Sequence, residues 1–335
     1  MSASEVNGAT TETNEAPPSG NRPRYRLVTR SDFDGLVCAV LLRERRLIDD
    51  ILFVHPKDMQ DGKVDITNRD ITTNLPYVAE AHLVFDHHES ETLRNTSARS
   101  NHVIQADAPS AARVVYNYYG GASAFPNVSD EMMEAVDQAD SARYSMKEIL
   151  DPQGWDLLNF IMDPRTGLGR FRDFTVSNYQ LMMELIDHCQ KLTIDEILAL
   201  PNVKERIEVY REHDARHLEQ VKQCATVYDN CVVLDLRNES TIWAGNRFTL
   251  YAAFMQCNIS IHVMWGRERL NTVFAVGKSI LNKRGPAASL NIGELCLSYG
   301  GGGHRNAGTC QVPNEVAGEV LGELVQALTG KKIRR

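Results

Sequence analysis

Short apolar segments alternate with helical patterns over the first 145 residues. Two helices are expected over Ser110–Tyr119, with Ser110 as N-cap, and over Glu131–Ala139, and an earlier one over the apolar stretch that starts at Leu36. Strand-like segments occur at residues 25–29, 50–55, 64–70 and 82–86. Strands that alternate with helices predict an α/β domain with a parallel sheet.

The pattern changes twice in the rest of the chain. Residues 146–228 are helical in pattern and end in one long helix over 202–227, which contains neither Pro nor Gly. Strands then return in CVVLDLR, ISIHVMW and TVFAVGKSI, with helices in FTLYAAFMQ, GELCLSY and around Leu321–Leu328. We therefore expect a parallel-sheet domain over 25–145, a helical insert and linker over 146–228, and a smaller α/β domain over 229–335.

Composition narrows the class of protein. Of the 335 residues, 43% are hydrophobic and 24% are charged, which is typical of a water-soluble globular protein, and no apolar run is long enough to span a membrane. The polar residues 1–24 predict a disordered tail rather than a signal peptide. Seven scattered cysteines without a CxxC pair indicate reduced thiols in a cytoplasmic protein.

The net charge of −8 argues against a long duplex nucleic acid as partner. It permits a short anionic substrate, because divalent cations and a few local basic residues can reverse the field inside a cleft. We expect no membrane partner.

Acidic and histidine side chains gather where the predicted strands end. Asp32 and Asp34 follow the first strand, Asp70 ends the segment 64–70, and Asp86 precedes His87 and His88 after the segment 82–86. In open α/β sheets, ligands bind at the carboxyl edge of the strands. We prefer Asp70 to Asp65 because it lies at the end of its segment.

Carboxylates held close together repel one another unless a cation lies between them. Oxygen ligands combined with imidazole suit manganese, magnesium or iron better than a structural zinc. Asp70 is therefore expected to bridge two metals about 3.5–4 Å apart, as in two-metal hydrolases. Taken alone, the Asp32–Asp34 pair is more typical of a turn or a helix cap than of a metal site.

A second cluster is the sequence SYGGGGHRNAGTC. Its successive glycines, among them Gly301, Gly302 and Gly303, allow the backbone to approach an anion, and His304 and Arg305 follow at once. A plain flexible loop is the alternative. No GK[ST] follows the glycines, so they are not a Walker A loop, and they follow a helix rather than a strand, which disfavours a dinucleotide fingerprint.

The segments RSDFDG, RDITTN, FDHHES, APSAARVVYNYY and AVDQAD resemble, in order, the motifs of the DHH phosphoesterase superfamily over residues 25–145. That superfamily includes nano-RNases, cyclic-dinucleotide phosphodiesterases, exopolyphosphatases and family II inorganic pyrophosphatases. CNISIHV, FAVGKSI and GGGGHRNAGT resemble its DHHA1 substrate-binding domain over about 230–330.

The resemblance implies roles for individual residues. Asp34, Asp70 and His87 would hold one Mn2+, Asp32 and Asp70 would hold a second, and His88 would lie near the substrate phosphate. The fourth motif supplies one more ligand, for which Asp140 is preferred to Asp137. Residues from the second domain would hold a substrate phosphate or 3′ end, namely Lys278, Gly301, Gly302, Gly303, His304 and Arg305.

One departure from the family pattern concerns the first motif. The family has a histidine two or four residues before the first aspartate, where this chain has Arg30 and Val28. Arginine stays protonated and cannot ligate a metal. Either the metal is held more weakly, or His55 or Asp58 substitutes, or Arg30 itself contacts a phosphate in catalysis.

The function expected is a Mn2+-dependent phosphoesterase that hydrolyses short oligonucleotides or linear dinucleotides with a metal-activated water, with Mg2+ or another divalent cation as a substitute. An exopolyphosphatase is the alternative within the class, and a non-catalytic nucleotide-binding sensor is the alternative outside it. Related enzymes often form dimers, so a homodimer is expected. Arg165, Arg170 and Arg172 could contact phosphates, although a solvated surface is the preferred reading.

Overall fold

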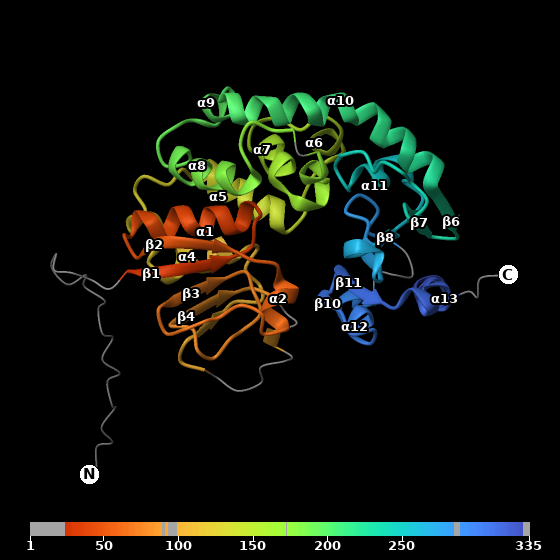
Figure 1. The fold of residues 1–335 in the computed structure, drawn as a ribbon, viewed down its shortest axis with the longest axis horizontal. Coiled ribbons are helices and arrows are strands. Elements are labelled where there is room, and N and C mark those ends of the chain that lie inside the picture. The colour runs from red at the N-terminus through yellow and green to blue at the C-terminus, as the bar shows by residue number, and fades with distance from the viewer. Residues whose placement is uncertain (1–23, 89–90, 93–98, 172, 285–288, 331–335) are drawn as a thin grey trace, which may run out of the picture.

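The computed structural model describes residues 24–88, 91–92, 99–171, 173–284 and 289–330. Two sheets lie on opposite sides of the molecule, and a long helix, α10, arches from the side of the first to the side of the second (Figure 1). Apart from Arg24, the tail predicted over residues 1–24 lies outside the described residues.

The N-terminal sheet has five strands in the order β2-β1-β3-β4-β5, and every neighbouring pair is parallel. The predicted parallel sheet is therefore confirmed. The strand β5 was not predicted. The strands are β1 (Tyr25–Thr29), β2 (Ile48–Phe53), β3 (Asp70–Thr73), β4 (Leu83–Asp86) and β5 (His102–Ile104).

Helices cover both faces of this sheet. Alternate residues of a strand point to opposite faces, so Leu27 packs into the main core while Val28 packs into a small cluster with Met59 and Leu75 on the other side. The helices are α1 (Phe33–Glu44), α2 (Pro56–Gln60), α4 (Ala111–Tyr118) and α5 (Asp130–Asp140). The predicted cap is confirmed, because the Ser110 hydroxyl accepts from the Arg113 N–H at 3.0 Å.

The middle of the chain is helical, as predicted. Its last helix ends at Cys224 rather than at Val227, because Ala225–Tyr228 forms β6, an edge strand of the second sheet. The helices are α6 (Met146–Leu150), α7 (Gly154–Met162), α8 (Asn178–His188), α9 (Ile194–Leu198) and α10 (Pro201–Cys224). Short 3-10 turns are η1 (Gly121–Ser123), η2 (Pro164–Thr166) and η3 (Leu168–Arg170).

The second sheet is mixed, with the order β10-β11-β9-β8-β7-β6. Among the described strands, β7 and β8 are its one parallel pair. The strands are β6 (Ala225–Tyr228), β7 (Cys231–Asp235), β8 (Ile259–Trp265), β9 (Thr272–Lys278), β10 (Gly302–His304) and β11 (Ala307–Val312). Its helical elements are α11 (Thr249–Ala253), α12 (Ile292–Leu297), α13 (Ala317–Thr329), η4 (Arg267–Arg269) and η6 (Asn314–Val316).

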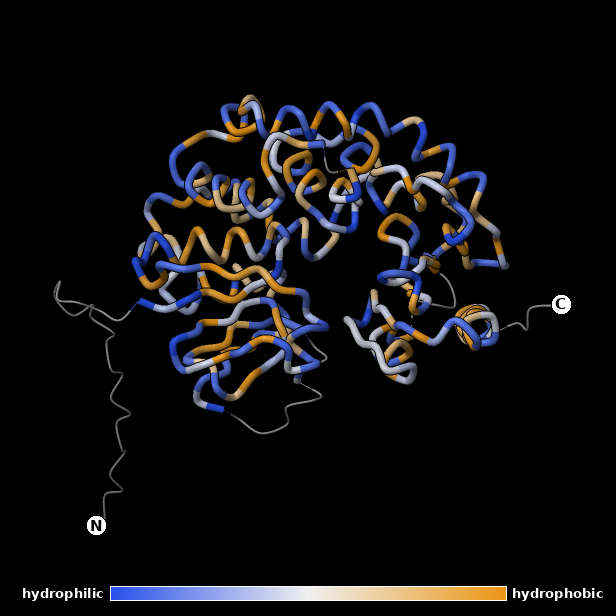
Figure 2. Tube along the Cα trace, in the orientation of Figure 1, coloured by the Kyte–Doolittle hydropathy of each residue, from blue (hydrophilic) through white to orange (hydrophobic). Residues whose placement is uncertain are grey.

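Each sheet has its own hydrophobic core. The strands of the first sheet and helix α1 form mostly hydrophobic stretches of the trace, whereas α10 alternates between hydrophilic and hydrophobic positions (Figure 2). Within the part of the chain that the structure describes, no helix is both long and apolar enough to cross a membrane.

Candidate metal and phosphate site

The carboxyl ends of the strands β1, β3 and β4 meet at one edge of the first sheet. Asp32 and Asp34 follow β1, Asn74 follows β3, and His87 follows β4. The register places Thr73 opposite Phe85, so Asn74 lies beside Asp86, and the Asn74 N–H donates to the Phe85 carbonyl at 3.1 Å. Loop residues of three strands are thereby collected at one place, as is usual for ligand sites in such sheets.

Asp34, His87 and Asp140 converge at this edge. Their ligand atoms all lie within 4.8 Å of one another, and His87 Nε2 is 3.0 Å from the Asp140 carboxylate. Asp34 lies in the first turn of α1, and its side chain is buried against the N-terminus of α4. There its carboxylate accepts from the N–H groups of Ala111 and Ala112 at 3.0 and 2.7 Å. A helix N-terminus favours a negative charge, so α4 holds Asp34 in a fixed position.

These residues fit a divalent cation. His87 Nδ1 lies 3.1 Å from the Ala108 carbonyl, which can only accept, so Nδ1 carries the proton of the neutral imidazole and leaves the Nε2 lone pair to face the carboxylates. Among the described residues, buried Asn74 Oδ1 has no hydrogen-bond partner, and His87 Nε2 is not aligned for a hydrogen bond although Asp140 Oδ2 lies 3.0 Å away. Buried polar atoms are normally satisfied. A cation with hard oxygen ligands and one imidazole, such as Mn2+ or Mg2+, would satisfy them.

The three side chains perturb one another. Burial, followed by the charge of Asp140, raises the pKa of Asp34 to about 8. Burial opposes ionisation of His87, but the adjoining carboxylates of Asp140 and Asp34 raise its pKa to about 10. Burial favours a raised pKa for Asp140, but the contact with His87 outweighs burial and holds this pKa well below its usual range. Asp34 and His87 therefore retain protons near neutral pH, and a bound cation would displace them.

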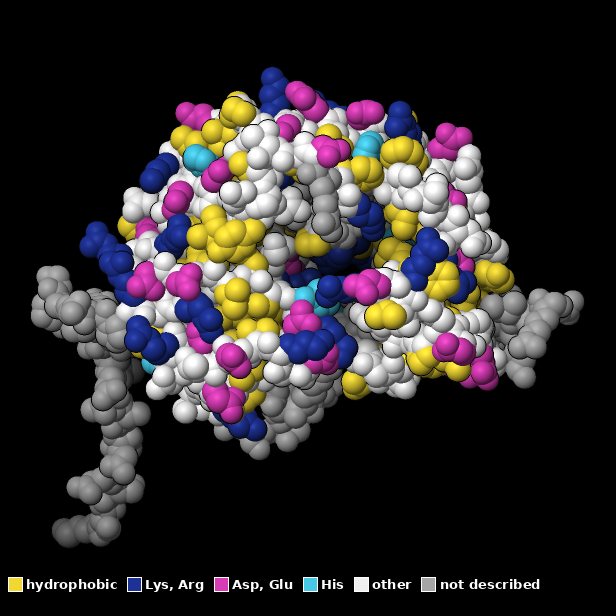
Figure 3. Space-filling view, in the orientation of Figure 1, with side chains coloured by type: hydrophobic (Ala, Val, Ile, Leu, Met, Phe, Trp, Pro, Cys, Tyr) yellow, Lys and Arg dark blue, Asp and Glu magenta, His cyan; other side chains and the backbone are white. Residues whose placement is uncertain are grey.

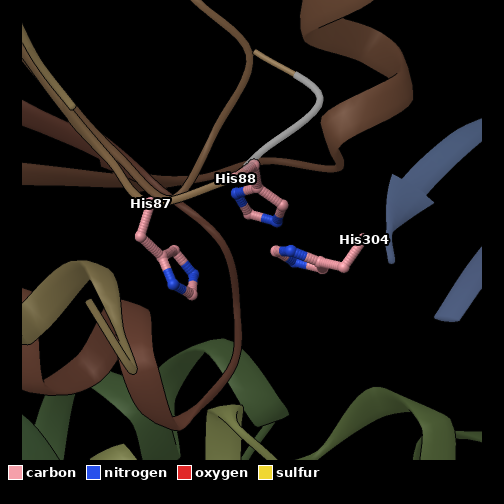
Figure 4. Close-up of side chains that lie close together, drawn as sticks. All are labelled: His87, His88 and His304. Carbon is pink, nitrogen blue, oxygen red and sulfur yellow. The ribbon is translucent and has the colours of Figure 1, made fainter. Parts of the chain in front are cut away.

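A second set of side chains connects the two sheets. His88 Nδ1 lies 2.6 Å from Asp86 Oδ1, and the His88 ring stacks on that of His304 with centroids 4.3 Å apart and planes 23° apart (Figure 4). His304 ends β10 of the second sheet. Burial and then His88 lower the pKa of His304 to about 3, so this imidazole is neutral at pH 7.

His87, His88 and His304 also have ring nitrogens within 4.8 Å of one another. A metal held by three imidazoles needs lone pairs that converge, and each lone pair lies in the plane of its ring. The nearly parallel rings of His88 and His304 direct their lone pairs along parallel planes instead. We therefore favour the set with Asp34 and Asp140 as the metal site.

Both carboxylate oxygens of Asp32 have partners. Arg30 Nε lies 3.1 Å from Asp32 Oδ2, while Oδ1 accepts from the Gly35 N–H at 3.0 Å and from Asn74 Nδ2 at 3.5 Å. Asp32 is also the N-cap of α1. Neither candidate for replacing the family histidine joins the converging ligands of the described residues: His55 caps α2, and Asp58 pairs with Lys63 at 3.3 Å.

The expected placement of Asp70 is wrong. Asp70 begins β3 instead of ending a strand, and it forms an ion pair with Arg26 Nε at 2.7 Å. Asp70 lies four positions before Asn74, which corresponds to about 13 Å along an extended strand. Asp70 therefore lies at the opposite edge of the sheet, where the structure provides no place for it among the converging ligands.

The two aspartates of the fourth motif have different surroundings. Asp137 is buried and accepts from the Ser110 hydroxyl at 2.7 Å and from Arg113 Nε at 2.8 Å. Asp140, the last residue of α5, faces His87. The preference for Asp140 over Asp137 agrees with this geometry.

The backbone of the glycine run packs directly against the backbone of β11 and does not form a plain loop. A Cβ on Gly301 would lie 2.0 Å from the Thr309 carbonyl oxygen, and one on Gly303, at φ +151°, would lie 2.3 Å from that of Ala307. Gly302 pairs with Thr309 in the ladder between β10 and β11. Close backbone packing thus accounts for these glycines, and its result is to place His304 against His88.

Basic side chains line the same region. Burial and then the charge of Arg305 lower the pKa of Lys278, which ends β9, so these two cations lie near each other. Arg165, in η2, binds Asp163 through Nε at 2.7 Å. Burial opposes its charge, but Asp163 and then Asp32 and Asp140 raise the pKa of Arg165, which places this side chain within reach of the acidic cluster.

Figure 3 shows a hollow between the two lobes, where basic, acidic and histidine side chains gather. The contact between His88 and His304 crosses it. Sequence reasoning missed Asn74 and undervalued Arg165, whereas Arg172 lies outside the described residues. The run of β-branched residues after Asp70, Ile71 to Thr73, is the signal that could have located the true strand and hence Asn74 at its end.

Comparison with known proteins gives a specific result. No protein-family model matches the chain, and no curated protein matches it. Among solved structures, the pGpG-specific phosphodiesterase PggH from Vibrio cholerae is 60% identical, with a TM-score of 0.73, and the match covers 92% of this chain and 99% of that one. The chain belongs to the DHH/DHHA1 phosphoesterase superfamily.

Two other solved structures are far less similar. CDC45 from Entamoeba histolytica is 9% identical with a TM-score of 0.42, over 91% of this chain and 95% of that one. A putative family II inorganic pyrophosphatase from Methanococcus jannaschii is 12% identical with a TM-score of 0.27, over 92% of this chain and all of that one. Neither is similar enough to inform the site.

Proposed function

We propose that this protein hydrolyses the phosphodiester bond of a short linear dinucleotide that carries a 5′ phosphate, as in pGpG, and that a divalent cation is required. The oxygen of a water molecule joins the phosphorus, and the bond from phosphorus to the 3′ oxygen breaks. A proton passes to that leaving oxygen, and the products are two nucleoside 5′-monophosphates. The name of the 60% identical relative supports this substrate class.

Asp34, His87 and Asp140 would hold the cation, with Mn2+ preferred. When bound, such a cation polarises a phosphoryl oxygen and lowers the pKa of a bound water towards neutrality. The N–H groups of Ala111 and Ala112 keep Asp34 oriented, and the Ala108 carbonyl keeps the His87 ring oriented. These backbone contacts fix the ligands before the substrate arrives.

Asp86 and His88 would act on the substrate. Asp86 accepts from His88 Nδ1 at 2.6 Å, so Nε2 of His88 is left to give a proton to the leaving oxygen or to bind a phosphoryl oxygen. Burial opposes ionisation of Asp86, but His88 and His87 lower its pKa, so Asp86 stays ionised and keeps His88 oriented. His304, from the second domain, would bind the same phosphate as a neutral donor.

Arg165, Lys278 and Arg305 would bind the remaining phosphate and the distal nucleotide. Arg165 comes from the helical insert and is influenced by the charges of Asp32 and Asp140, and Lys278 and Arg305 come from the second domain and influence each other. A site enclosed by two domains favours a short substrate over a long duplex.

All seven cysteines, each within the described residues, are free, which supports a reducing compartment such as the cytoplasm. The homodimer stays a prediction.

The observation that carries the proposal is the convergence of Asp34, His87 and Asp140 opposite the stacked rings of His88 and His304. The test is a substrate panel with the full chain, stripped with EDTA and then supplied with Mn2+. The panel contains pGpG, the same dinucleotide without its 5′ phosphate, a five-nucleotide RNA, 3′-phosphoadenosine 5′-phosphate and polyphosphate. We expect mononucleotide release from pGpG, dependent on the added metal.

Two variants complete the panel. His87→Ala should lose turnover by at least 10³-fold, whereas Asp70→Asn, which changes a carboxylate at the other edge of the sheet, should keep turnover near the wild-type rate. Phosphate release from polyphosphate with no cleavage of dinucleotides would make the exopolyphosphatase the correct assignment. Binding of pGpG without turnover at any metal concentration would make the protein a sensor.

A further inference from the structure

We infer that this chain holds a single divalent cation and that Arg30 and Asn74 take the place of the second cation of a two-metal centre. The inference rests on the proposed function only in using Asp34, His87 and Asp140 as the metal site. It concerns the other half of the centre, around Asp32, where the residues present do not fit a metal.

Both oxygens of the Asp32 carboxylate already have partners. The Arg30 guanidinium lies 3.1 Å from Oδ2, and two N–H donors, from Gly35 and Asn74, point at Oδ1. Arginine is protonated at any pH the protein tolerates and offers donors but no lone pair. A cation at this position would have to displace a guanidinium that already neutralises the carboxylate.

Asn74 occupies the place of a bridging ligand but lacks its chemistry. It lies directly beside Asp86 at the carboxyl edge, in the left-handed region at φ +56°, which asparagine and aspartate adopt more readily than other side chains. An amide has one oxygen and no charge, so it cannot bridge two cations as a carboxylate does. Its Nδ2 donates to Asp32 Oδ1, which leaves Oδ1 of Asn74 as a ligand for one cation.

The charges of the buried cluster support a single cation. Asp32, Asp34 and Asp140 contribute three negative charges, and Arg30 contributes one positive charge. His87 is neutral when it acts as a ligand, and Asp86 is paired with His88. One divalent cation therefore balances the charges of Asp32, Asp34, Asp140 and Arg30, while Arg165 is balanced by Asp163. A second would leave two excess positive charges among buried groups, which is costly in a medium of low dielectric constant.

Arg30 can also act on the substrate. Its side chain is 27% exposed, while that of Asp32 is 7% exposed, so the guanidinium is the more accessible group of the pair. A guanidinium binds phosphoryl oxygens through two parallel N–H donors. Arg30 would thus supply the positive charge that a second metal supplies elsewhere, without requiring another bound ion.

The test counts Mn2+ ions on the full chain. Equilibrium dialysis followed by elemental analysis should give one Mn2+ per wild-type chain, and the electron paramagnetic resonance spectrum should be that of an isolated ion. The double variant Arg30→His/Asn74→Asp should bind a second Mn2+ and show the signal of an exchange-coupled pair. Arg30→Gln should keep one Mn2+ and lose about 10²-fold in turnover, the usual effect of removing one charge-stabilising donor.

Matched controls separate the possible failures. Arg26→Gln/Asp70→Asn removes an arginine–aspartate pair that joins β1 to β3 at the other edge of the sheet, and this variant should still bind one Mn2+. Two Mn2+ per wild-type chain with a coupled signal would overturn the inference and leave the proposed function intact. No Mn2+ on the wild type, or one that His87→Ala retains, would overturn the metal site itself. A folded double variant with only one Mn2+ would show that Arg30 and Asn74 do not exclude the second.

Discussion

Binding of Mn2+ near neutral pH should release about two protons from the protein. The reason lies in the surroundings of two ligands. Burial and Asp140 raise the pKa of Asp34 to about 8, and the adjoining carboxylates, against the effect of burial, raise the pKa of His87 to about 10. Both side chains therefore carry a proton at pH 7, and both must lose it before they can ligate.

The magnitude follows from the two pKa values. Removing the proton of Asp34 at pH 7 costs about one pKa unit and removing that of His87 about three, so the total cost is on the order of 5 kcal/mol. Because the pKa values of both side chains are raised, the cost of removing their protons falls as the pH rises. The affinity for Mn2+ should increase about 100-fold per pH unit below pH 8 and about tenfold per unit between pH 8 and 10.

Isothermal titration calorimetry measures this release directly. Titrations of the EDTA-stripped chain with Mn2+ at pH 7, in two buffers that differ in ionisation enthalpy, give the number of protons transferred. Asp70→Asn serves as control and should release the same number as the wild type, since Asp70 is paired with Arg26 far from the ligands. A release below half a proton, or an affinity that does not change between pH 6 and 8, would refute the reasoning.

Three further changes test other parts of the structure. Burial and Glu148 raise the pKa of Asp156 to about 6, above its value in the unfolded chain. Ionised Asp156 therefore destabilises the fold at pH 7, and this penalty disappears below about pH 4. Asp156→Asn should add about 1 kcal/mol to the urea-measured free energy of unfolding at pH 7, after allowance for partial exposure, and nothing at pH 4. Arg26→Gln should leave the buried Asp70 carboxylate without its ion pair and lower the free energy of unfolding by about 2–3 kcal/mol, with Mn2+ binding unchanged. Arg165→Gln should raise KM for pGpG about tenfold with little change in kcat, because one phosphate contact is lost, and the effect should shrink for the dinucleotide without a 5′ phosphate; an equal fall in kcat would contradict a binding role.

The pattern of the chain was sufficient for most of the fold. Strands β1, β2 and β4 and helices α1, α4 and α5 lie close to where alternation and capping predicted them. The strand β5 escaped because it has only three residues between polar segments. The segment 64–70 misled because Val64 and Ile66 alternate as in a strand, yet they pack from a loop against the small cluster of Val28, Met59 and Leu75. Burial alone produces that alternation without strand pairing.

The site was partly accessible from the sequence. Asp34 and His87 could be selected because each carries metal-ligand chemistry close to a predicted strand end, and Asp140 because AVDQAD resembles the fourth family motif. Asn74 could not, since its importance depends on a register that puts it beside Asp86. The stacking of His88 on His304 joins residues more than 200 positions apart, and only the arrangement of the two domains reveals it.

A crystal of the full chain equilibrated with Mn2+ offers the most direct measurement. Anomalous scattering at a wavelength that reports on manganese locates each bound ion relative to its ligands. We predict one peak, in contact with Asp34, His87 and Asp140, and none between Asp32 and Arg30. A peak held by the three imidazoles instead, or the absence of any peak near His87 at saturating Mn2+, would contradict the account.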